Sequence, residues 1–194
     1  FFTDETEDAI GLVGSRVVGP TIADDIKSGA VYSIIFSLIV VFLYILIRFR
    51  KWQFSLGAVV ALLHDVLFVM GVFSLADGFL PFQLEVDQAF IAAILTVIGY
   101  SLNDTVVVFD RIRENMGSRG KQNGVSINKS LNQTLSRTFN TSLTTFFVLL
   151  VIFLFGGEVI RGFMFALLLG VLVGTYSSLF IATPVMFDAS DKES

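Results

Sequence analysis

The sequence has no cysteine and only one histidine among its 194 residues. Without cysteine the chain can form neither a disulfide framework nor a thiolate metal site, and one histidine cannot by itself build a zinc site. Charged residues make up only 15% of the chain, and they sum to a formal net charge of -4 with a pI near 4.9. This balance argues against a nucleic-acid-binding protein, because phosphate recognition needs a clustered excess of Lys and Arg.

Apolar residues are abundant instead. They account for 54% of the chain, which includes 21 Phe, and the mean hydropathy is +0.79. This composition is too apolar for a soluble domain and predicts an integral membrane protein. An α-helix rises about 1.5 Å per residue, so about 20 apolar residues cross the hydrocarbon core of a bilayer. Windows of that length predict an all-α bundle of five transmembrane helices, at residues 28–47, 52–76, 88–109, 138–157 and 162–187.

The positions of Lys and Arg predict how the bundle is oriented. Basic residues crowd the connection at 48–51 and the long connection at 110–137, whereas the connection at 77–87 has none. Basic residues near the ends of spans are retained in the cytoplasm. We therefore expect 110–137 to be a cytoplasmic loop, residues 1–27 to lie outside the cytoplasm and the tail 188–194 to lie inside it.

An N-terminal segment outside the cytoplasm needs an earlier span to deliver it. The sequence begins with Phe1 and shows no signal peptide. We therefore expect the chain to be part of a longer protein, with residues 1–27 as the last piece of an extracytoplasmic domain and its linker.

Two local patterns concern the packing of the helices. Ile127, Leu131 and Leu135 recur every four residues, which predicts a short amphipathic helix at the membrane surface or a continuation into the fourth span. Gly170 and Gly174 form a small-xxx-small pair, a pattern that lets helix backbones approach closely.

Asp104 lies inside the third predicted span, where a charge needs a physical explanation. A charged side chain in hydrocarbon costs about 2.5–3.5 kcal/mol, so it persists only when it is paired, hydrated or neutralised. Thr96, Gly99 or Tyr100, Asn103 and Asp104 fall close to i, i+3, i+4, i+7 spacing. Such a polar stripe must face protein or water rather than lipid.

The fourth predicted span offers Asp104 a partner. A stripe of the same spacing lies near its cytoplasmic end and consists of Arg137, Asn140, Thr141 and Thr144. A nearby Arg favours the ionised carboxylate, whereas removal from water favours the protonated form. Small movements of the neighbours could then switch the protonation of Asp104, as an ion-coupled protein requires.

A simpler interpretation assigns these residues no coupling role. Arg137 would extend to the interface as one more cytoplasmic anchor, and Asn103 and Thr105 would satisfy Asp104 locally. His64 and Asp65 form a second polar point near the middle of the second span. Adjacent helical residues point about 100° apart, so these two serve different contacts: a neutral His packed between helices and an Asp bonded to hydroxyls of another span, with a direct ion-carrying role as the alternative.

Two intramembrane carboxylates also raise the hypothesis of an intramembrane aspartyl protease. The catalytic Asp of such proteases follows a Gly-x-Gly pair, whereas residues 99–104 here read GYSLND. The sequence also has no Gly-x-x-x-x-Gly-Lys-Ser/Thr phosphate loop. We therefore expect no enzymatic activity and no cofactor, so any work must draw on an ion gradient or on a partner's nucleotide cycle.

The third span also carries a long motif, VIGYSLNDTVVVFDRIREN at 97–115, which resembles the signature of the SecF family. Shorter similarities cover nearly the whole chain, in VGP at 18–20, LHDV at 63–66, LSRT at 135–138, FGG at 155–157 and GF at 162–163. The resemblance implies the transmembrane fold of the RND superfamily. In that fold two related six-helix halves, SecD and SecF or the halves of a fused SecDF chain, enclose the coupling site.

The resemblance also implies a function and a set of partners. By position in the motifs, Asp104 and Arg137 match the charged coupling residues of the family, and an Asp from the SecD half has no counterpart here. The family works in the bacterial inner membrane and uses the proton gradient, or sodium in some members, to help pull preproteins from the SecYEG channel. The implied partners are thus SecD or the SecD half of the same chain, the SecYEG translocon, the preprotein and the lipid bilayer, with H+ or Na+ as the transported ion.

We hypothesise that protonation of Asp104 weakens its attraction to Arg137 and lets the third and fourth helices shift against the SecD half. Two alternatives share the architecture. One is half of an RND-type exporter of small molecules or lipids, which should lack the long motif at 97–115. The other is a purely structural membrane subunit, which should tolerate changes at both charged positions.

Overall fold

The computed structural model describes residues 20–82, 84–116 and 124–191, and these form an all-α bundle. Within this part of the chain, five helical segments are long and apolar enough to cross a membrane, which confirms the predicted fold class. The elements are α1 (Pro20–Phe49), α2 (Trp52–Ala76), α3 (Gln88–Asn115), α4 (Gly124–Phe155), α5 (Glu158–Ser177), the π-helical turn η1 (Ser178–Ala182) and α6 (Thr183–Asp191).

Several helices extend beyond the spans expected from hydropathy: α1 begins at Pro20 rather than at residue 28, and α3 and α4 extend into the connection between them. The α3 helix continues to Asn115, and α4 already begins at Gly124, so most of the expected loop 110–137 is helical. Charged residues end an apolar window but do not end a helix. The extended end of α3 and the extended start of α4 are joined by side-chain hydrogen bonds. The Asn115 amide donates to Ser130 Oγ (2.8 Å), and Arg111 Nε donates to Gln133 Oε1 (2.8 Å).

The pattern of Ile127, Leu131 and Leu135 belongs to this continuous α4, so of the two expected forms the chain adopts the continuation into the fourth span. Ile127 is buried against the bundle and Leu135 is exposed. Residues 20–27, which were expected to be linker, instead form the start of α1. The rest of the expected remnant domain, residues 1–19, lies outside the described residues, as do the first two residues of the VGP motif and the last three residues of the tail.

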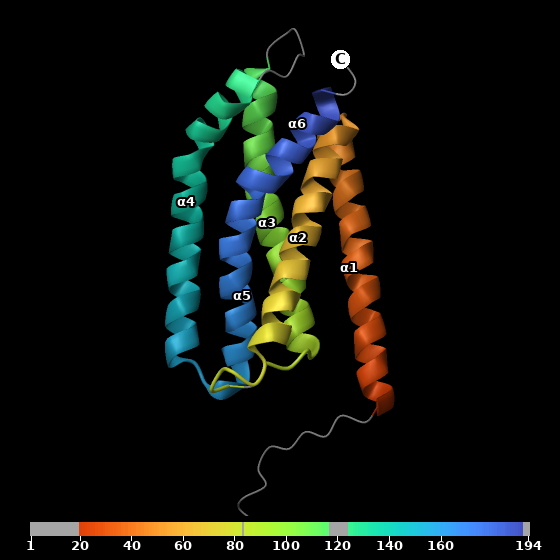
Figure 1. The fold of residues 1–194 in the computed structure, drawn as a ribbon, viewed down its shortest axis with the longest axis vertical. Coiled ribbons are helices and arrows are strands. Elements are labelled where there is room, and N and C mark those ends of the chain that lie inside the picture. The colour runs from red at the N-terminus through yellow and green to blue at the C-terminus, as the bar shows by residue number, and fades with distance from the viewer. Residues whose placement is uncertain (1–19, 83, 117–123, 192–194) are drawn as a thin grey trace, which may run out of the picture.

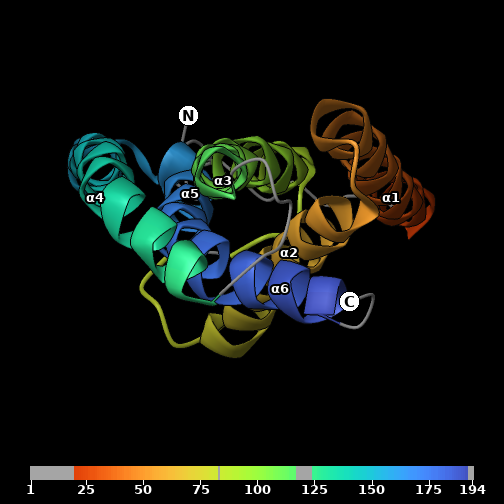
Figure 2. The ribbon, with the colours of Figure 1, turned by 90° about the horizontal axis from the view of Figure 1, so that it is seen from above.

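The helices differ in how much of their surface is covered. Figure 1 shows α1 and α4 at opposite edges of the bundle, with α2, α3 and α5 between them, and Figure 2 shows the same order from above. The most extensive contact joins α3 and α5. It depends on the glycine pair, since a Cβ at Gly170 would collide with the Val97 side chain and one at Gly174 would lie 2.9 Å from Ser101 Cβ. The pair therefore serves close helix packing, as the small-xxx-small pattern indicates.

The last span is bent. Its helical path passes from α5 through the π-helical turn into α6, and Figure 1 shows α6 leaning across the top of α2. Pro184 follows this turn, and a proline cannot donate the backbone hydrogen bond of a regular α-helix. Gly57 of α2 allows the close crossing, because a Cβ there would collide with the carbonyl oxygen of Ala182. The bend thus places α6 over α2 rather than beside it.

The end of the bundle that carries most of the basic residues is closed by three aromatic rings. Phe49, Phe54 and Phe109 are buried and lie within 5.1–6.0 Å of one another by ring centroid. Arg50 turns the chain from α1 into α2 with a φ of 58°, a left-handed conformation that is uncommon for a residue other than glycine. These contacts fix the ends of α1, α2 and α3 relative to one another.

The start of α3 supplies a prediction about stability. Asp87 is the N-cap of α3, and its carboxylate accepts a hydrogen bond from the Phe90 backbone N–H at 2.8 Å. Replacing an N-cap Asp by Ala typically costs about 0.5–2 kcal/mol. We expect Asp87→Ala to lower the thermal unfolding midpoint of the detergent-solubilised protein. Glu85→Ala, which removes an exposed acid two residues earlier, is the matched control and should leave the midpoint unchanged; equal losses in both variants would contradict the capping role.

Candidate ion-coupling site

Asp104 lies inside the bundle rather than on its surface. Only 3% of the residue is exposed, and its Oδ2 accepts a hydrogen bond from Ser142 Oγ of α4 at 3.2 Å. Thr175 of α5 hydrogen-bonds Ser142 in turn, with 2.6 Å between the two hydroxyl oxygens. The carboxylate of α3 is therefore connected to two neighbouring helices by hydroxyl groups.

Arg137 does not form an ion pair with Asp104. Its side chain is exposed, and among the described residues no nitrogen of Arg137 lies within 4.0 Å of the Asp104 carboxylate. Arg137 and an ionised Asp104 carry opposite charges on neighbouring helices, so they attract each other without direct contact. The direct contact expected from the two stripes is thus absent, and Ser142 occupies the position next to the carboxylate. The simpler interpretation also needs a change, because neither Asn103 nor Thr105 hydrogen-bonds to Asp104.

The polar stripe predicted on α4 faces outward. Arg137, Asn140 and Thr144 are exposed and Thr141 is half-buried. The threonine hydroxyls donate to carbonyl groups of their own helix, Thr141 to Arg137 at 2.9 Å and Thr144 to Asn140 at 3.0 Å. A polar side chain satisfied in this way needs no partner on another helix.

The residues of α4 that face the bundle form a different stripe. Ser130, Thr134, Thr138 and Ser142 recur every four residues and are all buried. This spacing was available in the sequence and indicates the inward face. The stripe that contains Arg137 therefore lies beside the inward face of α4 rather than on it.

The members of the stripe predicted on α3 do not all lie on one side of the helix. Thr96, Gly99 and Asn103 are exposed, whereas Asp104 points inward. Thr105 is buried, and its hydroxyl lies 2.8 Å from Ser178 Oγ of the π-helical turn.

A second carboxylate lies at a similar level of the bundle. Asp65 of α2 is fully buried, and its Oδ2 accepts hydrogen bonds from Ser101 Oγ of α3 at 2.6 Å and from Ser177 Oγ of α5 at 2.8 Å. Its Oδ1 lies 3.3 Å from Nδ1 of His64, whose side chain is partly exposed. The sequence predicted that His64 and Asp65 make different contacts. The structure adds that they also contact each other.

The two carboxylates share a central segment of α5 and η1. Thr175 bonds Ser142, the partner of Asp104, while Ser177 bonds Asp65 and Ser178 bonds Thr105. Sequence reasoning missed these hydroxyls. Their only signal was the cluster of Thr175, Ser177 and Ser178 in an otherwise apolar span.

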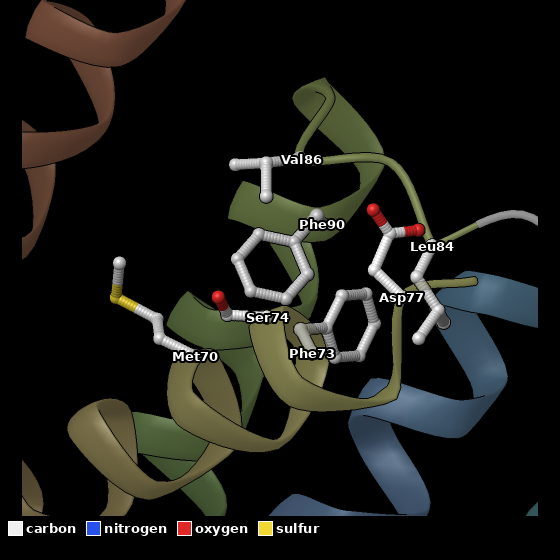
Figure 3. A pocket seen from close by; sticks show the side chains of 7 residues that line it. All are labelled: Met70, Phe73, Ser74, Asp77, Leu84, Val86 and Phe90. Carbon is white, nitrogen blue, oxygen red and sulfur yellow. The ribbon is translucent and has the colours of Figure 1, made fainter. Parts of the chain in front are cut away.

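A cavity of about 300 Å³ lies at the opposite end of the bundle from the aromatic rings. Figure 3 shows Phe73 and Phe90 at its centre and Asp77 near its edge, where α2 ends and the connection to α3 begins. It contains neither buried carboxylate and is therefore not part of the candidate site. The described residues also hold no cluster of three His, Cys, Asp or Glu that could bind a metal ion.

Comparison with known proteins places this geometry in a family. The family described as "Protein export membrane protein SecD/SecF, C-terminal" matches residues 3–192. A protein translocase subunit SecF of Rhodothermus marinus is 59% identical over 178 residues, which are 91% of this chain and 58% of that protein. The SecF subunit of Vibrio alginolyticus is 46% identical over 181 residues, or 93% of this chain and 55% of that protein. The chain thus spans little more than half the length of these curated relatives.

Solved structures show the same relationship. The crystal structure of SecDF from Thermus thermophilus, described as a translocon-associated membrane protein, matches with a TM-score of 0.77 and 40% identity. The match covers 91% of this chain and 24% of that one. A second SecDF crystal structure, in a super-membrane-facing form, gives a TM-score of 0.77 and 38% identity over 91% of this chain and 23% of the other.

Proposed function

The chain belongs to the SecD/SecF family of protein export membrane proteins, and on this basis we propose that it is the membrane region of a Sec export subunit driven by a proton or sodium gradient. The observation that carries the proposal is the buried carboxylate of Asp104, which is bonded to hydroxyls and makes no ion pair with a basic residue of the described chain. An unpaired intramembrane carboxylate is costly unless it binds an ion or a proton. The relatives are translocase subunits, that is, components of a transport machinery, and we propose no catalytic residue here.

The proposed mechanism uses the contacts of Asp104. When ionised, the carboxylate accepts the Ser142 hydrogen bond strongly and attracts the guanidinium of Arg137. Addition of a proton removes the charge, weakens the hydrogen bond and ends the attraction. Because Ser142 and Arg137 both belong to α4, binding of the ion changes the preferred position of α4 relative to α3.

The exposed polar surfaces of α3 and α4 fit the position of a SecD half. Bulky apolar residues cover the exposed side of α1, as expected next to lipid, but small or polar residues cover that of α3. We name this surface the α3–α4 polar surface; it consists of Ala89, Ala92, Thr96, Gly99 and Asn103 on α3 and Gln133, Arg137, Asn140 and Thr144 on α4. Gln133 hydrogen-bonds Arg111 and Asn115 of α3, so the α4 part lies on the side of α4 that faces α3.

The remaining partners and the orientation follow from the family. We propose association with SecD, or the SecD half of the same chain, with the SecYEG translocon and with an exported preprotein, in the bacterial inner membrane. The Lys and Arg bias supports a cytoplasmic position for the α1–α2 turn and the α3–α4 connection, with the N-terminal side outside. The transported species is H+ or Na+, and no cofactor is proposed.

Site-specific cross-linking tests this assignment. The chain has no cysteine, so a single Cys can be placed in a full-length parent protein whose other regions are also free of Cys. We expect Asn140→Cys, on the α3–α4 polar surface, to form a disulfide with a Cys scanned along the SecD half, and we expect copurification with SecYEG. Phe139, the residue before Asn140, is exposed on a flank of α4 shared with Leu143 and Phe147, so Phe139→Cys should not cross-link. Equal cross-linking at 139 and 140 would contradict the interface. Failure of the protein to copurify with SecYEG would favour an exporter.

A further inference from the structure

His64 and Asp65 form a polar pair in the middle of α2 that the mechanism at Asp104 does not use. Asp65 is 0% exposed, accepts hydrogen bonds from serines of α3 and α5, and lies next to His64 of its own helix. Both hydroxyl donors, Ser101 and Ser177, bond to the same oxygen, Oδ2, at 2.6 and 2.8 Å. The other oxygen, Oδ1, has one neighbour, the His64 Nδ1 atom at 3.3 Å.

The charges around Asp65 limit the states that this pair can adopt. Ser101 of α3 and Ser177 of α5 are uncharged, and no Lys or Arg of the described residues lies within 4.0 Å of the carboxylate. The next acid, Asp104, lies one helical turn beyond Ser101 and disfavours a second negative charge. A lone carboxylate in this interior would cost about 2.5–3.5 kcal/mol or more. A carboxylate beside a neutral imidazole carries one negative charge. The pair becomes neutral only when one proton is added to it.

The hydrogen bonds indicate where that proton lies. Ser177 Oγ lies closer to Oδ2 (2.8 Å) than to its other acceptor, the Gly174 carbonyl oxygen (3.2 Å), so we take both serines as donors to Oδ2. An oxygen that accepts two hydroxyl donors has no room for a proton of its own, so Oδ2 is the carbonyl-like oxygen of the acid. The proton then belongs to Oδ1, between Asp65 and His64 Nδ1. In this arrangement both residues are neutral and every polar atom of Asp65 has a partner, which is the least costly state for a buried group.

His64 brings the other end of this hydrogen bond to the surface of the described bundle, near the middle of the second span. Its side chain is 36% exposed, and its Nε2 makes no hydrogen bond within the described residues. Imidazole can accept a proton at one nitrogen and release one from the other. The step starts from a neutral His64 that carries its proton on Nδ1, beside an ionised Asp65. When a second proton binds Nε2, the Nδ1 proton can pass to the Asp65 carboxylate. The histidine is then neutral again, and Asp65 has become a carboxylic acid.

We propose that His64 and Asp65 form a second proton-binding site of this half, with the resting proton on Asp65 Oδ1 and exchange through His64. The site also touches the turn of α3 that carries Asp104. Asp65 hydrogen-bonds Ser101, which lies three residues before Asp104. Asp65 also bonds Ser177, and the next residue, Ser178, bonds Thr105, which directly follows Asp104. Loss of the Asp65 proton strengthens the bond to Ser101 and so bears on the position of Asp104. This consequence for coupling rests on the proposed function, whereas the existence of the site does not.

Infrared spectroscopy of the full-length protein in liposomes tests the site directly, because the carbonyl stretch of a carboxylic acid is absent from a carboxylate. The background is Asp104→Asn, which removes the other buried acid. We expect the Asp104→Asn variant to show a carboxylic acid band at neutral pH. The double variant Asp104→Asn/Asp65→Asn should lack this band. Asparagine keeps the size of Asp65 and an oxygen acceptor for the serines, so the double variant should stay folded, as its gel-filtration profile would verify. Identical spectra from two folded variants would overturn the proposal.

Exchange of the acid proton for deuterium tests the route. In D2O the band shifts as the proton is replaced, and we expect His64→Ala to slow this shift roughly tenfold or more, because the shuttle is gone. Leu63→Ala, the exposed residue beside His64, is the matched control and should exchange as fast as the parent. Equal rates in His64→Ala and the parent would refute exchange through His64. Neither measurement involves export, so failure here is distinct from failure of the role assigned to Asp104.

Discussion

Asp104→Asn in the full-length protein is expected to abolish the part of preprotein export that depends on the ion gradient. Asparagine has the size of the aspartate and can still accept the Ser142 hydrogen bond, but it can neither bind a proton nor carry the charge that attracts Arg137. Translocation into inverted membrane vesicles measures the effect. The rate of the variant should fall to that of parent vesicles whose gradient has been collapsed, and it should no longer respond to the ionophore.

Asp110→Asn is the control for this experiment. Asp110 lies on the same helix, six residues on, but it is exposed and its ion pair with Arg48 at 3.1 Å is partly in solvent. Exposed ion pairs contribute about 0–1 kcal/mol, so this variant should keep gradient-dependent export. Collapse of the proton or the sodium gradient in separate samples identifies the ion. Unimpaired export by Asp104→Asn would remove the residue from the coupling mechanism.

Gly170→Ala is expected to destabilise the bundle although alanine is the better helix former. The contact of α3 with α5 is the most extensive in the bundle, and a Cβ at Gly170 would collide with the Val97 side chain, which is itself buried. Overpacking of this kind costs about 1–3 kcal/mol. Gly71→Ala is the matched control, because nothing lies within 4 Å of a Cβ there, and it should be neutral or stabilising. Thermal unfolding of the purified protein in detergent measures both, and Gly170→Leu should prevent recovery of a folded protein.

A second substitution shows whether the collision is the cause. Val97→Ala removes both γ-carbons that the new Cβ would meet. We expect Gly170→Ala/Val97→Ala to be more stable than the sum of the two single effects predicts, which is the signature of residues in contact. Strict additivity would mean that Gly170 matters for another reason, such as backbone flexibility.

The sequence predicted the number and order of the spans because hydrocarbon imposes a length that twenty apolar residues satisfy. It did not predict where α3 ends and where α4 begins. Hydropathy marks the membrane, whereas the ends of these helices depend on contacts between polar side chains outside it, such as those of Asn115 with Ser130 and Gln133. Such pairs lie far apart in the sequence, and no local pattern connects them.

The candidate site was predicted in part for a related reason. Asp104 and Asp65 are conspicuous as acids within apolar windows, so both were found. Their partners Ser142, Ser101 and Ser177 were not, because a serine in a transmembrane helix can satisfy itself on its own backbone, as Thr144 does here. Which hydroxyls turn inward is decided by the rotation of each helix in the bundle, and a single helix does not encode that rotation.

The unbroken length of α4 gives it the properties of a lever arm. Its 32 residues form one rod from Gly124 to Phe155, about 48 Å long at 1.5 Å per residue. The contact with Asp104 at Ser142 is about 27 Å from the Gly124 end, so a pivot of about 5° at that contact moves this end by about 2 Å. A rod without a break does not absorb such a displacement along the way. A change as small as one proton at Asp104 would thus appear as a movement of about 2 Å at the Gly124 end of α4, which lies beyond the span at 138–157.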